Sequence, residues 1–235
     1  MSPRSELRAL AALLLGLAGA PGVAAESPLP WGDQGDGTYR NPVLPADYSD
    51  PDVIRVGDDF YLVASEFHFM GIQVLHSRDL VNWRIIGRVF DRLGLDPKYD
   101  ENRAYSQGTW APTLRFHDGT FYLYVCTPRD GLLRYTARDP AGPWTGGLIK
   151  AVDQWEDPCP FWDDDGQVYL VHGWAKSRSG KNNLLTLNQL AADGSHVTDG
   201  DGVDDLLVAA PMYTPAFIGR ERSEERRVGK ECLRL

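Results

Sequence analysis

The sequence predicts an all-β protein of the β-propeller class, and two observations lead to this prediction. The body of the chain repeats one hairpin, in which an acidic or glycine turn enters a strand of aromatic and β-branched residues. The three clearest copies are GDDFYLV (57–63), DGTFYLY (118–124) and DGQVYLV (165–171). Their matching tyrosines, Tyr61, Tyr122 and Tyr169, are 61 and 47 positions apart. Such spacings are close to the period of about 40 to 50 residues typical of propeller blades.

Further strands are expected on both sides of each hairpin. Each copy follows an Asp-Pro or Ala-Pro step and an apolar run, at 50–56, 111–116 and 157–162. The first two copies are followed by another strand and a polar turn that ends at Trp83 or Trp144. Blades pack radially with their first strand nearest the channel, so the starts of the copies should converge on one axial pocket. A β-sandwich is the alternative, but it does not predict the repeated turn.

Only about three blades are visible in the sequence, whereas propellers close with at least four. We therefore expect an incomplete propeller with open edges, occupying residues 39–218.

The N-terminal residues have the pattern of a secretory signal. Arg4 and Arg8 precede an apolar run at 10–20, and small residues lead to an expected cleavage after Ala25. A buried N-terminal helix is the alternative interpretation, but the run is apolar all round and a Pro/Gly-rich linker, 26–38, follows it. The protein is therefore expected to be secreted or periplasmic.

The last residues differ sharply in composition from the body. In segment 219–235, ten of seventeen residues are charged and six of these are basic. One interpretation is a basic terminal tail. The other, which we favour, is an artefact, because SEERRVGKEC resembles translated sequencing-adapter read-through. In that case the true reading frame is lost after Val208.

Charge and motif content exclude several classes of function. The chain has 24 basic and 33 acidic residues and a net charge of −9, which argues against nucleic acid or an anionic membrane as a partner. It contains no Gly-rich phosphate loop, no serine nucleophile elbow and no apolar run long enough to span a bilayer. After signal cleavage we expect no membrane association. The sequence does not fix the oligomeric state.

Two aspartates stand at equivalent places in the repeat. Asp50 opens the first copy in the step SDPD, and Asp157 opens the third in EDPC. An isolated Asp-Pro step is normally a turn former. Here the repeat brings both carboxylates towards the axis, where like charges shift each other's pKa at a cost to folding. Their recurrence in register therefore indicates a functional use.

Four segments together resemble glycoside hydrolase family 43, the inverting β-xylosidases and α-L-arabinofuranosidases. They are NPVLPADYSDPDVIRVGDDFYLVAS, VLHSRDLVNWRIIGRV, TWAPTLRFHDGTFYLYV and DPCPFWDDDGQVYLVHGWA, in that order, and the resemblance covers residues 39–190. It implies a five-bladed propeller whose substrate is a carbohydrate. The implied reaction is hydrolysis of O-glycosidic bonds in xylose- or arabinose-containing oligo- and polysaccharides.

The resemblance also implies roles for individual residues. Asp50 matches the general base that activates water, and Asp157 matches the aspartate that raises the pKa of the general acid and orients it. Trp110 corresponds to the aromatic residue against the sugar, and Phe67 more loosely to an apolar wall of the same pocket. Inversion needs two carboxyl groups about 6.5 to 9.5 Å apart, which a propeller axis can hold rigidly.

The sequence departs from the family pattern in two places. The family's general acid is a Glu in a Glu-Gly-Pro step, and this step is absent from the chain. The glutamates after Asp157 all lie in the charged tail: Glu221, Glu224, Glu225 and Glu231. We therefore expect a fragment that is truncated before its acid and inactive by itself. The second departure is Phe69-Met70-Gly71, which lacks the family's usual Pro before Gly.

Two other functions stay open at this point. One is a propeller that only binds glycan, and the other is a relative of the five-bladed fructan hydrolases. No cofactor is predicted, and the histidines and cysteines have no metal-ligand spacing. A structural calcium ion would be compatible with the full-length propeller only.

Overall fold

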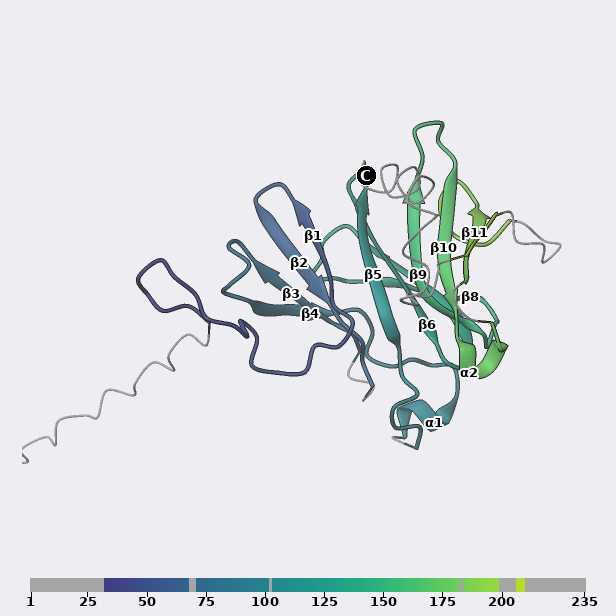
Figure 1. Cartoon of the computed structure of the whole chain (residues 1–235), viewed down its shortest axis with the longest axis horizontal. Coiled ribbons are helices and arrows are strands. Elements are labelled where there is room, and N and C mark those ends of the chain that lie inside the picture. Colours follow the sequence, from purple (N-terminus) through teal and green to yellow (C-terminus); the bar gives the residue numbers. More distant parts are fainter. Residues whose placement is uncertain (1–31, 68–70, 102, 182–183, 199–205, 210–235) are drawn as a thin grey trace, which may run out of the picture.

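The computed structural model of the chain describes residues 32–67, 71–101, 103–181, 184–198 and 206–209. Within these ranges, three four-stranded antiparallel sheets stand side by side (Figure 1). The all-β prediction is confirmed. The expected signal (1–25), the first part of the linker and the charged tail (219–235) lie outside the described residues.

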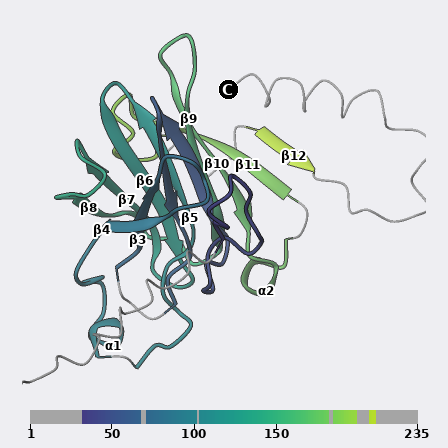
Figure 2. The ribbon, with the colours of Figure 1, turned by 90° about the vertical axis from the view of Figure 1, so that its left-hand side faces the viewer.

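Each sheet is built in simple sequence order, as a propeller blade is. The first contains β1 (Asp52–Val56), β2 (Asp59–Val63), β3 (Gln73–Ser77) and β4 (Arg84–Arg88). The second contains β5 (Trp110–His117), β6 (Thr120–Thr127), β7 (Gly131–Ala137) and β8 (Thr145–Lys150). The third contains β9 (Trp155–Trp162), β10 (Val168–Trp174), β11 (Leu184–Leu190) and β12 (Leu206–Ala209). Figure 2 shows β11 and β12 on the side of the third sheet away from β5.

The repeated turn forms the first hairpin of every sheet. Gly57, Gly119 and Gly166 have φ angles of 62°, 71° and 82°, in the left-handed region that glycine adopts without a Cβ penalty. The aromatic and aliphatic residues after each turn form β2, β6 and β10. The structure therefore contains the three hairpins predicted from the sequence.

The inner strands β1, β5 and β9 lie next to one another and connect the three sheets. Apolar residues fill both junctions. Val63, Leu114 and Leu123 are buried between the first and second sheets, and Trp155 and Leu170 belong to the core between the second and third. The position of each inner strand is thus fixed by the packing of whole sheets.

Arg115 on β5 ties the three inner strands together. Its Nη1 donates to Oδ2 of Asp52 on β1 at 2.8 Å, and its Nη2 donates to Sγ of Cys159 on β9 at 3.0 Å. The same Asp52 oxygen also accepts the backbone N–H of Leu114 at 2.7 Å. Charge-assisted hydrogen bonds of this kind hold the strands in register around the axis.

Two short helices lie in loops, one before the second sheet and one between β10 and β11 of the third. They are α1 (Pro97–Asp100) and α2 (Lys176–Ser179). In the described part of the chain, no helix is long and apolar enough to cross a membrane.

Candidate active site

The inner strands begin with the same unusual backbone in all three sheets. Asp50, Ala111 and Asp157 each precede a proline and have φ angles of 49°, 44° and 54°. Non-glycine residues rarely adopt the left-handed region, and such strain costs roughly 1–3 kcal/mol where it persists. Its recurrence at three equivalent positions marks this end of the inner strands, where α1 and α2 also lie (Figure 1), as the candidate site.

Asp50 is exposed and is held by two hydroxyl groups. Its Oδ2 accepts from Ser49 Oγ at 3.1 Å and from Ser65 Oγ at 2.7 Å. Its Oδ1 accepts no hydrogen bond from the residues that the structure describes. One oxygen is therefore fixed, while the other stays available to a ligand or a water molecule.

Asp157 lies close enough to Asp50 to interact with it electrostatically. Its side chain is exposed, yet the surrounding protein atoms displace part of its hydration. This partial loss of hydration, and secondarily the negative charge of Asp50, raise the pKa of the Asp157 carboxyl above its ordinary value. The structure therefore brings together the two aspartates that the repeat pairs.

Glu156 is a third carboxyl group at this place, which the sequence analysis missed. It is half-buried, with its Cγ against Gly173 of β10. Burial and the charge of Asp157 raise the pKa of Glu156, and the guanidinium of Arg178 on α2 opposes that shift. The signal that could have found it is its position directly before Asp157 in an apolar strand.

Trp110 and Phe67 form an aromatic corner beside the carboxylates. Their ring centroids are 6.3 Å apart and their planes are at 76°, an edge-to-face arrangement. The Trp110 Nε1–H donates to the carbonyl of Ser106 at 3.2 Å, which fixes the indole. Phe69 and Met70, where the sequence of the neighbouring loop departs from the family pattern, lie outside the described residues.

Arg178 is a second residue that the sequence analysis missed. Its guanidinium lies 5.8 Å from the ring centroid of Trp110, and its Nε donates to the carbonyl of Asp153 at 2.5 Å. Nothing in the spacing of α2 could have indicated this contact, because it depends on how the loop after β10 folds back.

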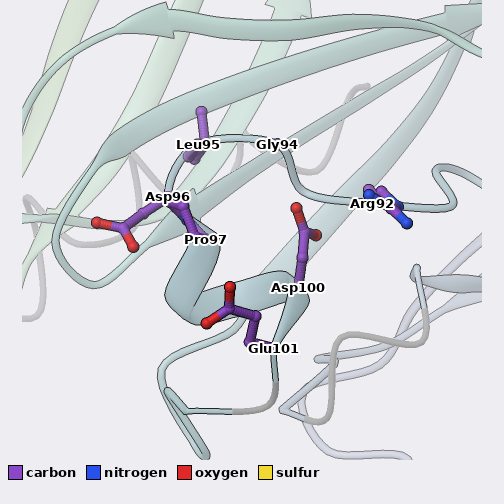
Figure 3. Close-up of a pocket in the computed structure, with 7 residues that line it drawn as sticks. All are labelled: Arg92, Gly94, Leu95, Asp96, Pro97, Asp100 and Glu101. Carbon is purple, nitrogen blue, oxygen red and sulfur yellow. The ribbon is translucent and has the colours of Figure 1, made fainter.

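A hollow of about 410 Å³ lies beside α1, away from these residues (Figure 3). Two of the acidic side chains that line it already have partners. Asp96 caps α1 by accepting the N–H of Lys98 at 2.8 Å, and Glu101 accepts from Arg103 at 2.7 Å. In the part of the chain that the structure describes, no group of three or more His, Cys, Asp or Glu side chains could hold a metal ion.

The family model of the glycosyl hydrolases family 43 matches residues 39–208. The chain belongs to glycoside hydrolase family 43. Its fold class is therefore that of the five-bladed β-propellers, of which the structure describes three sheets. The family match spans the Asp50, Trp110 and Asp157 positions.

Members of family 43 with related sequences carry xylosidase and arabinofuranosidase names. A putative β-xylosidase of Xylanibacter ruminicola is 51% identical over 170 residues, which are 72% of this chain and 31% of that protein. A non-reducing end α-L-arabinofuranosidase of Bacteroides ovatus is 47% identical over 139 residues, 57% of this chain and 26% of its own.

A solved structure of the same family supports the fold. The xylan β-1,4-xylosidase from Bacillus halodurans superposes with a TM-score of 0.59 at 34% identity, covering 68% of this chain and 32% of that one. The chain thus spans about a third, or less, of the length of these three relatives.

Proposed function

We propose that this chain carries the water-activating half of an inverting family 43 glycosidase acting on xylose- or arabinose-containing glycans. Asp50 is the general base, Asp157 raises the pKa of the general acid and orients it, and Trp110 with Phe67 forms the wall against which the sugar lies. The observation that supports this most directly is the meeting of Asp50 and Asp157 beside an aromatic corner at the start of the inner strands.

The physical chemistry of these groups suits the proposed reaction. A carboxylate with one free oxygen can take a proton from water as the water attacks the anomeric carbon. An aromatic face against the C–H surface of a sugar supplies orientation with little loss of conformational entropy. The negative charge of Asp50 and Asp157 also favours the oxocarbenium-like transition state.

We further propose that the general acid comes from a segment outside these 235 residues, since no Glu-Gly-Pro step occurs in them. Glu156 has a raised pKa but lies next to Asp157 on the same strand, so no acid role is assigned to it. On this proposal the 235-residue chain alone binds glycan with negligible turnover. The leader at 1–25 would direct the protein to the periplasm or the exterior.

The test is hydrolysis of 4-nitrophenyl β-D-xyloside and α-L-arabinofuranoside by the product of the complete gene, sequenced through codon 208 and beyond. Inversion is read by ¹H NMR from the first-formed anomer. We expect Asp50→Asn to lower kcat by about 10²- to 10⁴-fold, the usual contribution of a general base. Asp58→Asn, at the exposed tip of the first hairpin, is the matched control. Equal activity of Asp50→Asn and the parent would refute the assignment.

A glycan-binding protein without turnover is the second candidate, and the absence of a Glu-Gly-Pro step favours it for the chain as given. Tryptophan fluorescence titration with xylo- and arabino-oligosaccharides separates the two. Binding that Trp110→Ala weakens, together with no hydrolysis by the complete gene product, would favour the binding function.

A further inference from the structure

Ser65 contacts Asp50 just beyond the paired part of the first hairpin. The register of β1 and β2 pairs Asp52 with Val63. Beyond that pair the backbone N–H of Ser65 donates to the carbonyl of Ser49 at 2.9 Å, one residue out of this register, where Asp50 has its φ of 49°. The position of the Ser65 side chain is therefore set by the sheet and not by a free loop.

The hydroxyl of Ser65 makes two hydrogen bonds whose directions are fixed by chemistry. The backbone N–H of Ala111 can only donate, and it donates to Ser65 Oγ at 2.8 Å. The ionised carboxylate of Asp50 can only accept, so the hydroxyl proton goes to its Oδ2 at 2.7 Å. We call this pair of hydrogen bonds the Ser65 bridge.

The backbone N–H of Ala111, at one end of the Ser65 bridge, lies where the pairing of β5 with β6 is interrupted. Pairing between β5 and β6 is interrupted between Trp110 and Thr113, and Ala111 has its φ of 44° inside this bulge. The N–H of Ala111 takes Ser65 Oγ as its acceptor. Bulges re-aim side chains, and here the neighbouring residue is Trp110.

The segments around the Ser65 bridge are also joined by backbone hydrogen bonds. Glu66 and Thr109 exchange two of them, at 2.8 and 3.0 Å, and Phe67 accepts the N–H of Ser106 at 3.3 Å. These backbone hydrogen bonds, which we call the clasp, join the first and second sheets where the proposed base and the proposed sugar wall meet. Among these contacts, the Ser65 side chain is the part that touches the carboxylate.

We propose that Ser65 is a positioning residue that couples the two halves of the site. It holds Oδ2 of Asp50, so that Oδ1 faces the attacking water, and it fixes the backbone that presents Trp110 to the sugar. This inference rests on the proposed function of Asp50 and adds to it the oxygen that takes the proton and the residue that selects it. Ser49, at the longer 3.1 Å, supports the same oxygen without reaching the second sheet.

The hydrogen bonds are tested on the 235-residue chain, without any need for turnover. Because the Ser65 hydroxyl connects Asp50 to the N–H of Ala111, we expect the Ala111 amide resonance to shift as Asp50 ionises. Ser65→Ala and Asp50→Asn should each abolish that shift, and Ser65→Thr, which keeps the hydroxyl, should retain it. An Ala111 resonance that still follows Asp50 ionisation in Ser65→Ala would overturn the proposal.

The catalytic consequence is tested in the product of the complete gene. Losing a hydrogen bond to a charged group should lower kcat in Ser65→Ala about 10- to 100-fold, with KM little changed. Ser65→Thr should restore most of kcat.

Ser77→Ala is the matched control for both measurements. Ser77, at the end of β3, likewise donates to an aspartate, Asp79, at 2.9 Å and accepts a backbone N–H, that of Leu80, at 2.9 Å. Both partners lie in the turn that follows β3. We expect Ser77→Ala to affect stability without changing kcat or the response of the Ala111 resonance. If Ser65→Ala has the kinetics of the parent while Asp50→Asn is inactive, the role proposed for Ser65 is refuted and the proposed function stands. A fully active Asp50→Asn would refute the proposed function itself.

Discussion

At the residue scale, the candidate site combines features that oppose folding. Asp50 and Asp157 are like charges held near each other, and both have a backbone conformation that few aspartates adopt. A sequence selected for stability alone would not be expected to keep both features at equivalent positions. The sequence was sufficient to single out these two residues, because each stands in a motif that recurs in register.

Asp157→Asn should stabilise the chain at neutral pH. The folded-state pKa of Asp157 is raised, so the folded protein binds the proton more tightly than the unfolded chain does. Stability contributed by this carboxyl is then lost as pH rises from about 4, the ordinary aspartate pKa, through the folded value. Urea unfolding near pH 4 and near pH 7 should give a gain for the variant that grows with pH.

Asp79→Asn is the control of opposite sign. Hydrogen bonds from the Asn82 side chain and then from the backbone N–H groups of Asn82 and Val81 lower the pKa of Asp79. Its contribution to stability is present above the ordinary aspartate pKa and is lost as pH falls through the folded value. This variant should therefore be destabilised at neutral pH, and a gain there would contradict the hydrogen bonds described around Asp79.

Trp110→Ala should weaken sugar binding more than it slows the chemical step. The indole offers a face to the ligand and does not transfer protons, so its loss should raise KM or Kd by about 10-fold, corresponding to roughly 1–2 kcal/mol of aromatic contact. Titration of the variant with xylo-oligosaccharides measures this, and Trp110→Phe should recover part of the affinity. A change confined to kcat would instead place Trp110 away from the sugar.

Two other side chains at the site could not be predicted from the sequence. Ser65 and Arg178 belong to no recurring motif, and each acquires its place through cross-strand pairing or loop return. Glu156, directly before Asp157, had a local signal that the sequence analysis did not use. The hydrogen bonds that set Ser65 against Asp50 are a property of the folded hairpin. Motif residues are thus accessible from spacing, whereas the residues that hold them depend on tertiary structure.

At the element scale, the hairpins were predictable because their turns carry a local requirement. Glycine in the left-handed region and the strand-forming residues after it act within a few positions of each other. The helix α1 also had a local signal, Asp96 before Pro97, which the sequence analysis passed over. The fold of the segment containing α2 has no comparable signal, since Ala175 at its N-cap makes no side-chain capping hydrogen bond.

Gly108→Ala should disrupt the clasp between the first and second sheets. A Cβ at this position would lie 2.0 Å from the carbonyl oxygen of Glu66, so the backbone must shift. We expect a loss of roughly 1–3 kcal/mol in the free energy of unfolding, as for other overpacking substitutions. Gly147→Ala on β8 is the matched control, because nothing lies within 4 Å of its Cβ and its change should stay within about 0.5 kcal/mol. Equal effects of the two substitutions would contradict the clasp.

At the scale of the whole molecule, the sheets are connected through the inner strands and expose apolar residues farther out. Contacts join β1 to β5 and β5 to β9. Large apolar side chains remain exposed on outer strands, among them Ile85 on β4 at 57% and Leu148 on β8 at 42%. The number of sheets could be anticipated from the repeat, but which faces stay uncovered could not, because burial depends on how each sheet is rotated against its neighbour.

The 235-residue chain should self-associate as its concentration rises. Strand edges with apolar side chains and unpaired backbone groups are templates for pairing with another chain. Sedimentation velocity over a concentration series should show growing oligomers. Placing a charge on two outer strands, in the double variant Ile85→Lys with Leu148→Lys, should reduce them, because a lysine on an edge disfavours edge-to-edge pairing. A parent chain that stays monomeric at every concentration would contradict this prediction and would mean that these edges are protected from pairing.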